Sequence, residues 1–103
     1  MINGSSEARV GDVVPLTCTT DNSNPPAEIR WTVGGKQVHN ATSRSVQSKD
    51  GGWITISDLV TAIPPGPRSV IVVCHGLNMD TAVGTHTIEV QCMYHNECCR
   101  LEW

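Results

Sequence analysis

The side chains best suited to chemistry are five cysteines and four histidines. Cys92, Cys98 and Cys99 surround His95 near the end of the sequence. Their Cys-x-x-His-x-x-Cys spacing supplies donors that zinc accepts, but it matches no paired-knuckle pattern of zinc-binding proteins. The alternative is that these cysteines pair across chains, and the sequence leaves their pairing and role open. We therefore predict no metal site and no cofactor.

The four histidines are scattered along the chain, at His39, His75, His86 and His95. Nucleophilic catalysis needs a nucleophile, a base and an orienting group that converge in one pocket. Nothing in the spacing places a serine, a histidine and a carboxylate together on adjacent strands. We therefore predict that the chain is not an enzyme.

The length of 103 residues suits one domain, and the composition favours strands over helices. Val, Ile and Thr together number 29, against 9 for Leu and Ala, and branched side chains suit a pleated sheet. Seven basic and ten acidic residues give a net charge of −3, which argues against a nucleic-acid partner or an anionic membrane surface. No apolar run approaches the ~18 residues of a transmembrane helix, so we expect no membrane insertion by this segment.

Alternating apolar residues and turn signals predict about seven short strands and no helix. Gly34-Gly35 predicts a tight hairpin, because glycine adopts a positive φ at little cost. Residues 40–47 are polar and indicate an edge strand or a loop. The expected strands are 13–20, 28–33, one that follows Gly35 and includes Val38, 40–47, 53–57 (followed by Leu59), 69–74 and 85–90. Their spacing is typical of an antiparallel β-sandwich.

The phase of the alternation assigns side chains to the core, because successive residues of a strand point to opposite faces. The predicted core positions are Leu16, Trp31, Ile56 and Val72. Trp53 is out of phase with Ile56, so we expect it to face outward on its sheet.

Cys18, Trp31 and Cys74 occupy characteristic places among these strands. Cys18 ends an early strand, Trp31 lies 13 residues further on in the next strand, and Cys74 ends the penultimate strand. In this arrangement the sequence resembles an immunoglobulin domain from about Ala8 to Val90. The resemblance implies an all-β, immunoglobulin-like sandwich in which a Cys18–Cys74 disulfide joins the two sheets and the Trp31 indole packs on it.

The subtype follows from one connection and one turn. About 15 residues separate Val38 from Trp53, too few for the two extra strands of a variable-type domain. The turn Asn24-Pro25-Pro26-Ala27 ahead of Trp31 is similar to that of constant-type (C2/I-like) domains in nephrin, Kirre and nectin-like cell-adhesion receptors. Val72 stands where many immunoglobulin domains carry a tyrosine two residues before the second cysteine.

Five cysteines in a short chain indicate an oxidising compartment, so we expect an extracellular or cell-surface location. The first residues lack the basic start and apolar stretch of a secretory signal, so we expect an ectodomain fragment of a longer protein. The expected organisation is a flexible N-terminal segment 1–7 (added in part by cloning), an immunoglobulin-like domain 8–91 and a flexible, cysteine-rich tail 92–103.

The strand that ends at Cys74 is apolar on both faces, and its second face is the best candidate for binding. Ile71 and Val73 are expected to point away from the core. Their expected neighbours on the same face are Arg30, Thr32, Thr87 and Glu89. An apolar centre with a charged rim is typical of a protein-binding surface, and the resemblance implies binding through this sheet. The alternative is a valine-rich strand that is simply buried, or covered by a neighbouring domain.

Two acceptor triplets for N-glycosylation occur, Asn40-Ala41-Thr42 and Asn3-Gly4-Ser5, and we expect a glycan at Asn40 in particular. The predicted function is adhesion or recognition by an extracellular receptor domain that binds another immunoglobulin domain or a second copy of itself. Two alternatives remain open: an immune-type protein that binds microbial or carbohydrate ligands, and a spacer domain that binds nothing.

Overall fold

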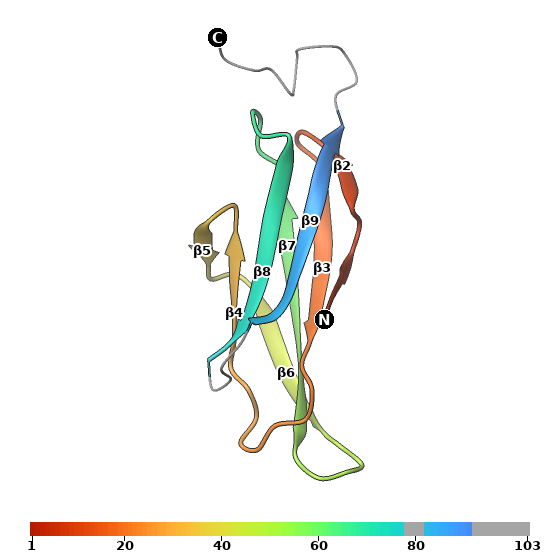
Figure 1. The fold of residues 1–103 in the computed structure, drawn as a ribbon, viewed down its shortest axis with the longest axis vertical. Helices are drawn as coiled ribbons and strands as arrows, with labels where there is room; N and C mark the ends of the chain where they lie inside the picture. The colour runs from red at the N-terminus through yellow and green to blue at the C-terminus, as the bar shows by residue number, and fades with distance from the viewer. Residues whose placement is uncertain (78–81, 92–103) are drawn as a thin grey trace.

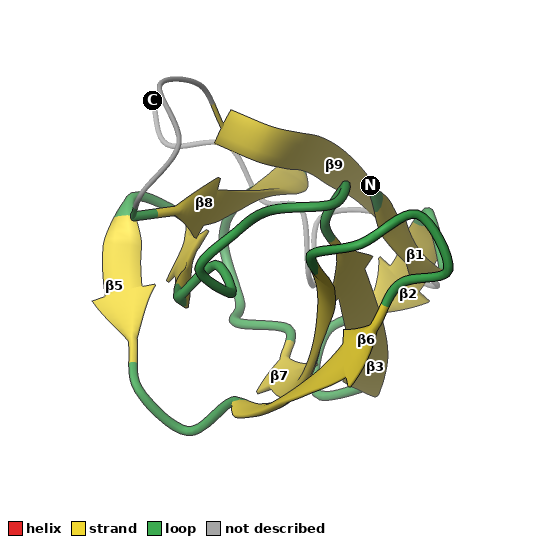
Figure 2. Ribbon diagram, turned by 90° about the horizontal axis from the view of Figure 1, so that it is seen from below, coloured by secondary structure: helices red, strands yellow, loops and turns green. Residues whose placement is uncertain are grey.

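The computed structural model describes residues 1–77 and 82–91, which form nine strands in two sheets packed face to face (Figure 1). The strands are β1 (Ile2–Gly4), β2 (Glu7–Arg9), β3 (Val13–Thr19), β4 (Ile29–Val33), β5 (Lys36–Val38), β6 (Thr42–Gln47), β7 (Trp53–Ala62), β8 (Ser69–Gly76) and β9 (Ala82–Gln91). One sheet has the order β1-β3-β7-β6 and is called the β7 sheet below. The other has the order β2-β9-β8-β4-β5 and is called the β8 sheet. Figure 2, which looks along the strands, shows the two sheets enclosing the interior.

The predicted all-β, immunoglobulin-like sandwich is confirmed, together with its inter-sheet disulfide. A bond joins Cys18 of β3 to Cys74 of β8, 56 residues apart in the chain. Trp31 is 1% exposed and lies opposite Cys74 in the β4–β8 register. The buried cluster around them comprises Ala8, Val14, Leu16, Leu59, Ile63, Val70, Val72, Ile88 and Val90.

The N-terminal segment is part of the sandwich, so the expectation that residues 1–7 are flexible is wrong. β1 pairs antiparallel with β3, and β2 pairs parallel with β9. These strands have three residues each, too short to show an apolar period. Backbone hydrogen bonds to longer strands hold them in place, and such bonds leave no trace in the sequence pattern.

The predicted edge elements agree with the structure. β4 and β5 form a hairpin closed by Gly34 and Gly35, whose φ angles are 58° and 84°. Residues 42–47 form β6, which pairs with β7 and is exposed at every position. The polar character of this segment therefore reflects a strand at the edge of the β7 sheet.

The prediction that Ile56 lies in the core is wrong. The residues of β7 that point inward and are buried are Thr55, Ser57 and Leu59, whereas Ile56 faces outward and is partly exposed. Trp53 shares the face of Thr55 and is half-buried, so the expectation that it faces outward is also wrong. Its backbone pairs with Ser23 in an isolated bridge.

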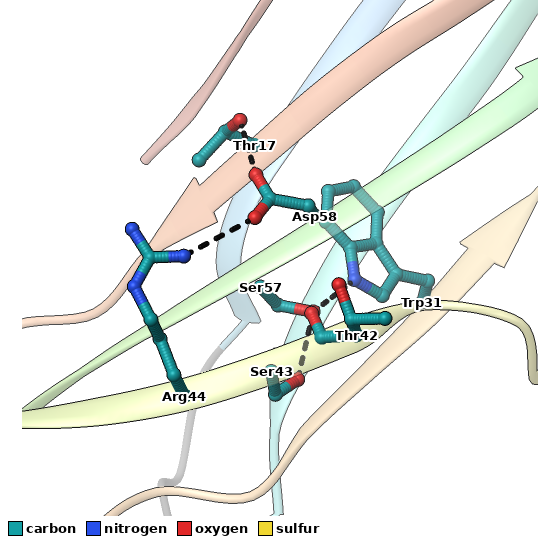
Figure 3. Close-up of polar contacts among 7 residues, drawn as sticks. All are labelled: Thr17, Trp31, Thr42, Ser43, Arg44, Ser57 and Asp58. Carbon is teal, nitrogen blue, oxygen red and sulfur yellow. Dashed lines mark hydrogen bonds and ion pairs between the residues drawn. The ribbon is translucent and has the colours of Figure 1, made fainter.

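Hydrogen bonds explain why hydroxyl groups occupy the inward face of β7. The Trp31 indole N–H donates to Ser57 Oγ at 2.8 Å, and Ser57 Oγ donates to the Thr42 carbonyl at 3.1 Å (Figure 3). Thr55 Oγ1 donates to the Ala27 carbonyl at 3.0 Å. A buried hydroxyl is tolerated when it is hydrogen-bonded. The partners come from other strands and loops, so the apolar pattern of β7 alone gave the wrong phase.

Candidate protein-binding site

Ile71 and Val73 lie on the outer face of β8, which is the central strand of the β8 sheet. They alternate with the buried residues Val70, Val72 and Cys74, which fixes their outward direction. Ile71 is 51% exposed and Val73 is half-buried. An isoleucine this exposed on a strand flanked on both sides is an apolar group that the fold itself leaves uncovered.

Threonines border these two side chains. Thr87 of β9 lies opposite Ile71, and Thr32 of β4 and Thr85 of β9 lie opposite Val73. Threonine presents a methyl group beside its hydroxyl, so the centre of the face combines apolar area with hydrogen-bonding groups. The structure therefore brings Thr32 and Thr87 next to the apolar pair, where the sequence placed them.

The two predicted charges lie further out. Arg30 lies opposite His75 at one end of β8, and Glu89 lies opposite Ser69 at the other end. Arg30 belongs to β4 and Glu89 to β9, so the charges occupy diagonal corners of the face. Arg30 is a diagonal neighbour of Val73 and Glu89 is a diagonal neighbour of Ile71, so both charges lie on the rim of the apolar centre.

An open groove of about 770 Å³ extends from Ile71 toward one end of the sandwich. Its walls are the Gly34-Gly35 turn and the proline-rich connection at Pro64 and Pro67, and Lys36 stands at its border. No pattern in the sequence predicted this groove. Glycines and prolines signal turns in a sequence, but they do not show which turns meet in space.

The two glycosylation candidates are both exposed. Asn40 lies in the connection between β5 and β6, at the open side between the two sheets. Asn3 lies in β1 opposite Thr17, on the outer face of the β7 sheet. Neither position belongs to the outer face of the β8 sheet.

The other sequence candidates concern a metal site. Within residues 1–77 and 82–91, no three His, Cys, Asp or Glu side chains are grouped so that they could hold a metal ion. The candidate zinc ligands Cys92, His95, Cys98 and Cys99 lie outside the described residues. Over the same two ranges, no helix is long and apolar enough to span a bilayer.

The chain is similar in sequence to proteins named as cell adhesion molecules. Cell adhesion molecule 2 from Rattus norvegicus, Mus musculus and Homo sapiens is 26% identical to the chain over 91 residues. The matched region covers 84% of this chain and 21% of each relative, so the chain spans about a fifth of their length.

Two solved structures share the fold. The three-domain ectodomain of mouse nectin-like molecule 4 is similar with a TM-score of 0.65 and 20% identity, over 88% of this chain and 33% of that chain. The D1-D2 fragment of Rst is similar with a TM-score of 0.61 and 16% identity, over 87% of this chain and 47% of that chain. The family model of the CD80-like C2-set immunoglobulin domain matches residues 1–77. Because this match includes both cysteines of the disulfide and the buried Trp31, the chain belongs to the C2-set immunoglobulin domain family.

Proposed function

We propose that this chain is an extracellular domain of a cell-surface adhesion receptor and that it binds another immunoglobulin domain through the outer face of the β8 sheet. The observation that carries the proposal is Ile71, which is 51% exposed on a central strand and borders an apolar groove. Burying such a side chain against a partner stabilises a complex by the hydrophobic effect. The relatives named as cell adhesion molecules support the adhesion part of the proposal.

The arrangement of charges favours a second copy of the chain as the partner. Arg30 and Glu89 lie at diagonal corners, with Ile71 and Val73 between them. A two-fold axis that lies between the facing sheets, runs obliquely across their strands and is perpendicular to the line from Arg30 to Glu89 places Arg30 of each copy over Glu89 of the other. The same axis stacks the apolar centres, which is the self-complementarity that a two-fold dimer requires.

Replacing both Ile71 and Val73 by serine tests the proposal. Beads coated with the unaltered chain are expected to aggregate, and beads coated with the I71S/V73S chain are not. The melting temperature is expected to stay nearly unchanged, because Ile71 is on the surface. A large fall in melting temperature would show that these residues belong to the core and would remove the proposal.

A charge exchange tests the homophilic form. In the R30E and E89R chains residues 30 and 89 carry the same sign of charge, so the exchanged pairs across the two-fold axis become repulsive in each variant. Beads carrying R30E mixed with beads carrying E89R are expected to aggregate again. If the unaltered chain does not self-associate, the homophilic form is wrong and the partner is a different immunoglobulin domain.

We also propose that Asn40 carries an N-linked glycan when the chain passes through the secretory pathway. Its exposed position between β5 and β6 leaves the acceptor accessible, and a glycan there leaves the outer face of the β8 sheet free. The N40Q chain from secretory cells is expected to lose the mass of one glycan. An unchanged mass would remove this assignment.

A further inference from the structure

The outer face of the β7 sheet is also apolar, and among its residues Ala62 also lines the groove beside Ile71. Val13 is 64% exposed, Val60 51% and Val46 41%. The register places Pro15 opposite Val60, and both are exposed. These side chains point away from the core, so three strands of the β7 sheet carry uncovered apolar groups on one face.

The apolar groups form two patches on either side of a polar centre. The first patch lies where β3 and β7 pair and consists of Val13, Pro15, Val60 and Ala62. The second lies where β6 and β7 pair and consists of Val46, Ile54 and Ile56. Asp58 separates the two patches along β7, with two outward residues on each side of it.

The polar centre is a small charged cluster. Asp58 accepts a hydrogen bond from Thr17 Oγ1 at 2.8 Å and forms an ion pair with Arg44 at 3.4 Å (Figure 3). The Arg44 and Asp58 side chains are 63% and 48% exposed. Both charges are therefore accessible to a second molecule.

We propose that this face binds a second copy of the chain, independently of the proposed function of the β8 sheet. A two-fold axis that passes beside Asp58 and runs across the strands stacks the first patch of each copy on the second patch of the other. The same axis brings the two exposed Arg44–Asp58 pairs together, so the arginine of each copy can also pair with the carboxylate of the other. Apolar area and charge are therefore complementary in one arrangement.

The size of the face sets the strength of the contact. Its apolar and charged residues come from three strands, which gives fewer residues than the roughly 20–30 that a standard interface takes from each partner. The dimer is therefore weak and forms at high concentration. Because the two outer faces lie on opposite sides of the sandwich, a chain that uses both joins neighbours into an open row.

The test is sedimentation velocity of the full chain, made without glycans because Asn3 shares the face. The C92S/C98S/C99S background prevents tail disulfides from joining chains. In that background I71K disables the β8 face, so any remaining association reports the β7 face. We expect the I71K chain to dimerise at high micromolar to millimolar concentration, and I71K/V60K to raise the dissociation constant at least ten-fold. Val60 and Ile71 are a matched pair, since each is 51% exposed.

Two outcomes would overturn the inference: an I71K chain that stays monomeric at every concentration, or an I71K/V60K chain that associates as strongly as I71K. A difference in association between the unaltered chain and the I71K chain tests only the β8 face. The two proposals are therefore tested by different comparisons. As a second measurement, dilution of the I71K chain is expected to shift backbone amide signals of β3, β6 and β7 in heteronuclear NMR spectra. Shifts confined to other strands would contradict the inference.

Discussion

β7 and β8 occupy corresponding places at the centres of the two sheets, yet they distribute their side chains differently. β8 is apolar on its inner face at Val70 and Val72, and it carries Ile71 outside. β7 buries the hydroxyls of Thr55 and Ser57 and carries isoleucines on its outer face.

The difference shows that the inner face of a strand is set by partners as well as by hydrophobicity. Ser57 is fully buried because it accepts the Trp31 indole N–H at 2.8 Å. An apolar residue at that place would leave a buried donor unpaired, which costs about 1–3 kcal/mol. The core of this domain therefore combines an apolar β8 with a hydrogen-bonded β7.

The largest expected effect is a difference in unfolding free energy between substitutions at two neighbouring residues of β7. L59A removes a side chain that is 2% exposed, and we expect it to lower the free energy of unfolding by about 2–5 kcal/mol. V60A, at a residue that is 51% exposed, is the matched control and is expected to change it by about 0.5 kcal/mol or less. Urea denaturation measures both, and similar losses would contradict the observed phase of β7.

The next effect concerns the hydroxyl network. S57A removes the acceptor of the buried Trp31 indole N–H, and we expect a loss of about 1–3 kcal/mol in unfolding free energy. The indole N–H signal of Trp31 in NMR spectra is expected to shift at the same time. S43A is the control, because Ser43 also bonds Ser57 but belongs to the exposed edge strand, and its effect is expected to be smaller.

Threonine substitutions compare the cost of a hydroxyl on the outer face of β7 with its cost on the inner face of β8. I56T places a hydroxyl on the outer face of β7, where it reaches solvent, and we expect a loss below about 1 kcal/mol. V72T places one at a fully buried position of β8, where an unpaired hydroxyl costs about 1–3 kcal/mol. Thermal denaturation compares the two, and a larger loss for I56T would restore the core assignment that the sequence pattern gave it.

The smallest effect is expected for the surface ion pair. Arg44 and Asp58 are 3.4 Å apart with largely exposed side chains, and such pairs contribute between about 0 and 1 kcal/mol. R44A is therefore expected to leave the melting temperature nearly unchanged at low and at high salt. A clear, salt-dependent fall would show that the pair stabilises the fold itself.

The elements that the sequence predicted well are those whose signal is local. Cys18, Trp31 and Cys74 are recognisable by type and spacing, and the double apolar alternation of β8 placed Ile71 outside. The phase of β7 could not be predicted from its apolar pattern, because burial of Thr55 depends on a hydrogen bond to the Ala27 carbonyl, which belongs to another segment.

The candidate site was predictable to the same degree. The apolar pair on β8 and its threonine neighbours follow from strand phase and strand order. The groove beside Ile71 and the outer face of β7 do not, since each depends on which turns or patches meet after folding. Because Ile56 was assigned to the core, the second apolar patch on the outer face could not be predicted either.

The parallel pairing of β2 with β9 has a mechanical consequence. Glu7, Ala8 and Arg9 lie alongside Glu89, Val90 and Gln91 in the same direction. A force that draws β2 toward its N-terminal end and β9 toward its C-terminal end slides the two strands past each other, so their hydrogen bonds are loaded together rather than one after another. Under such a pull, the three-residue strand β2 resists through its pairing with the ten-residue strand β9, and the direction of the force decides how well that pairing resists.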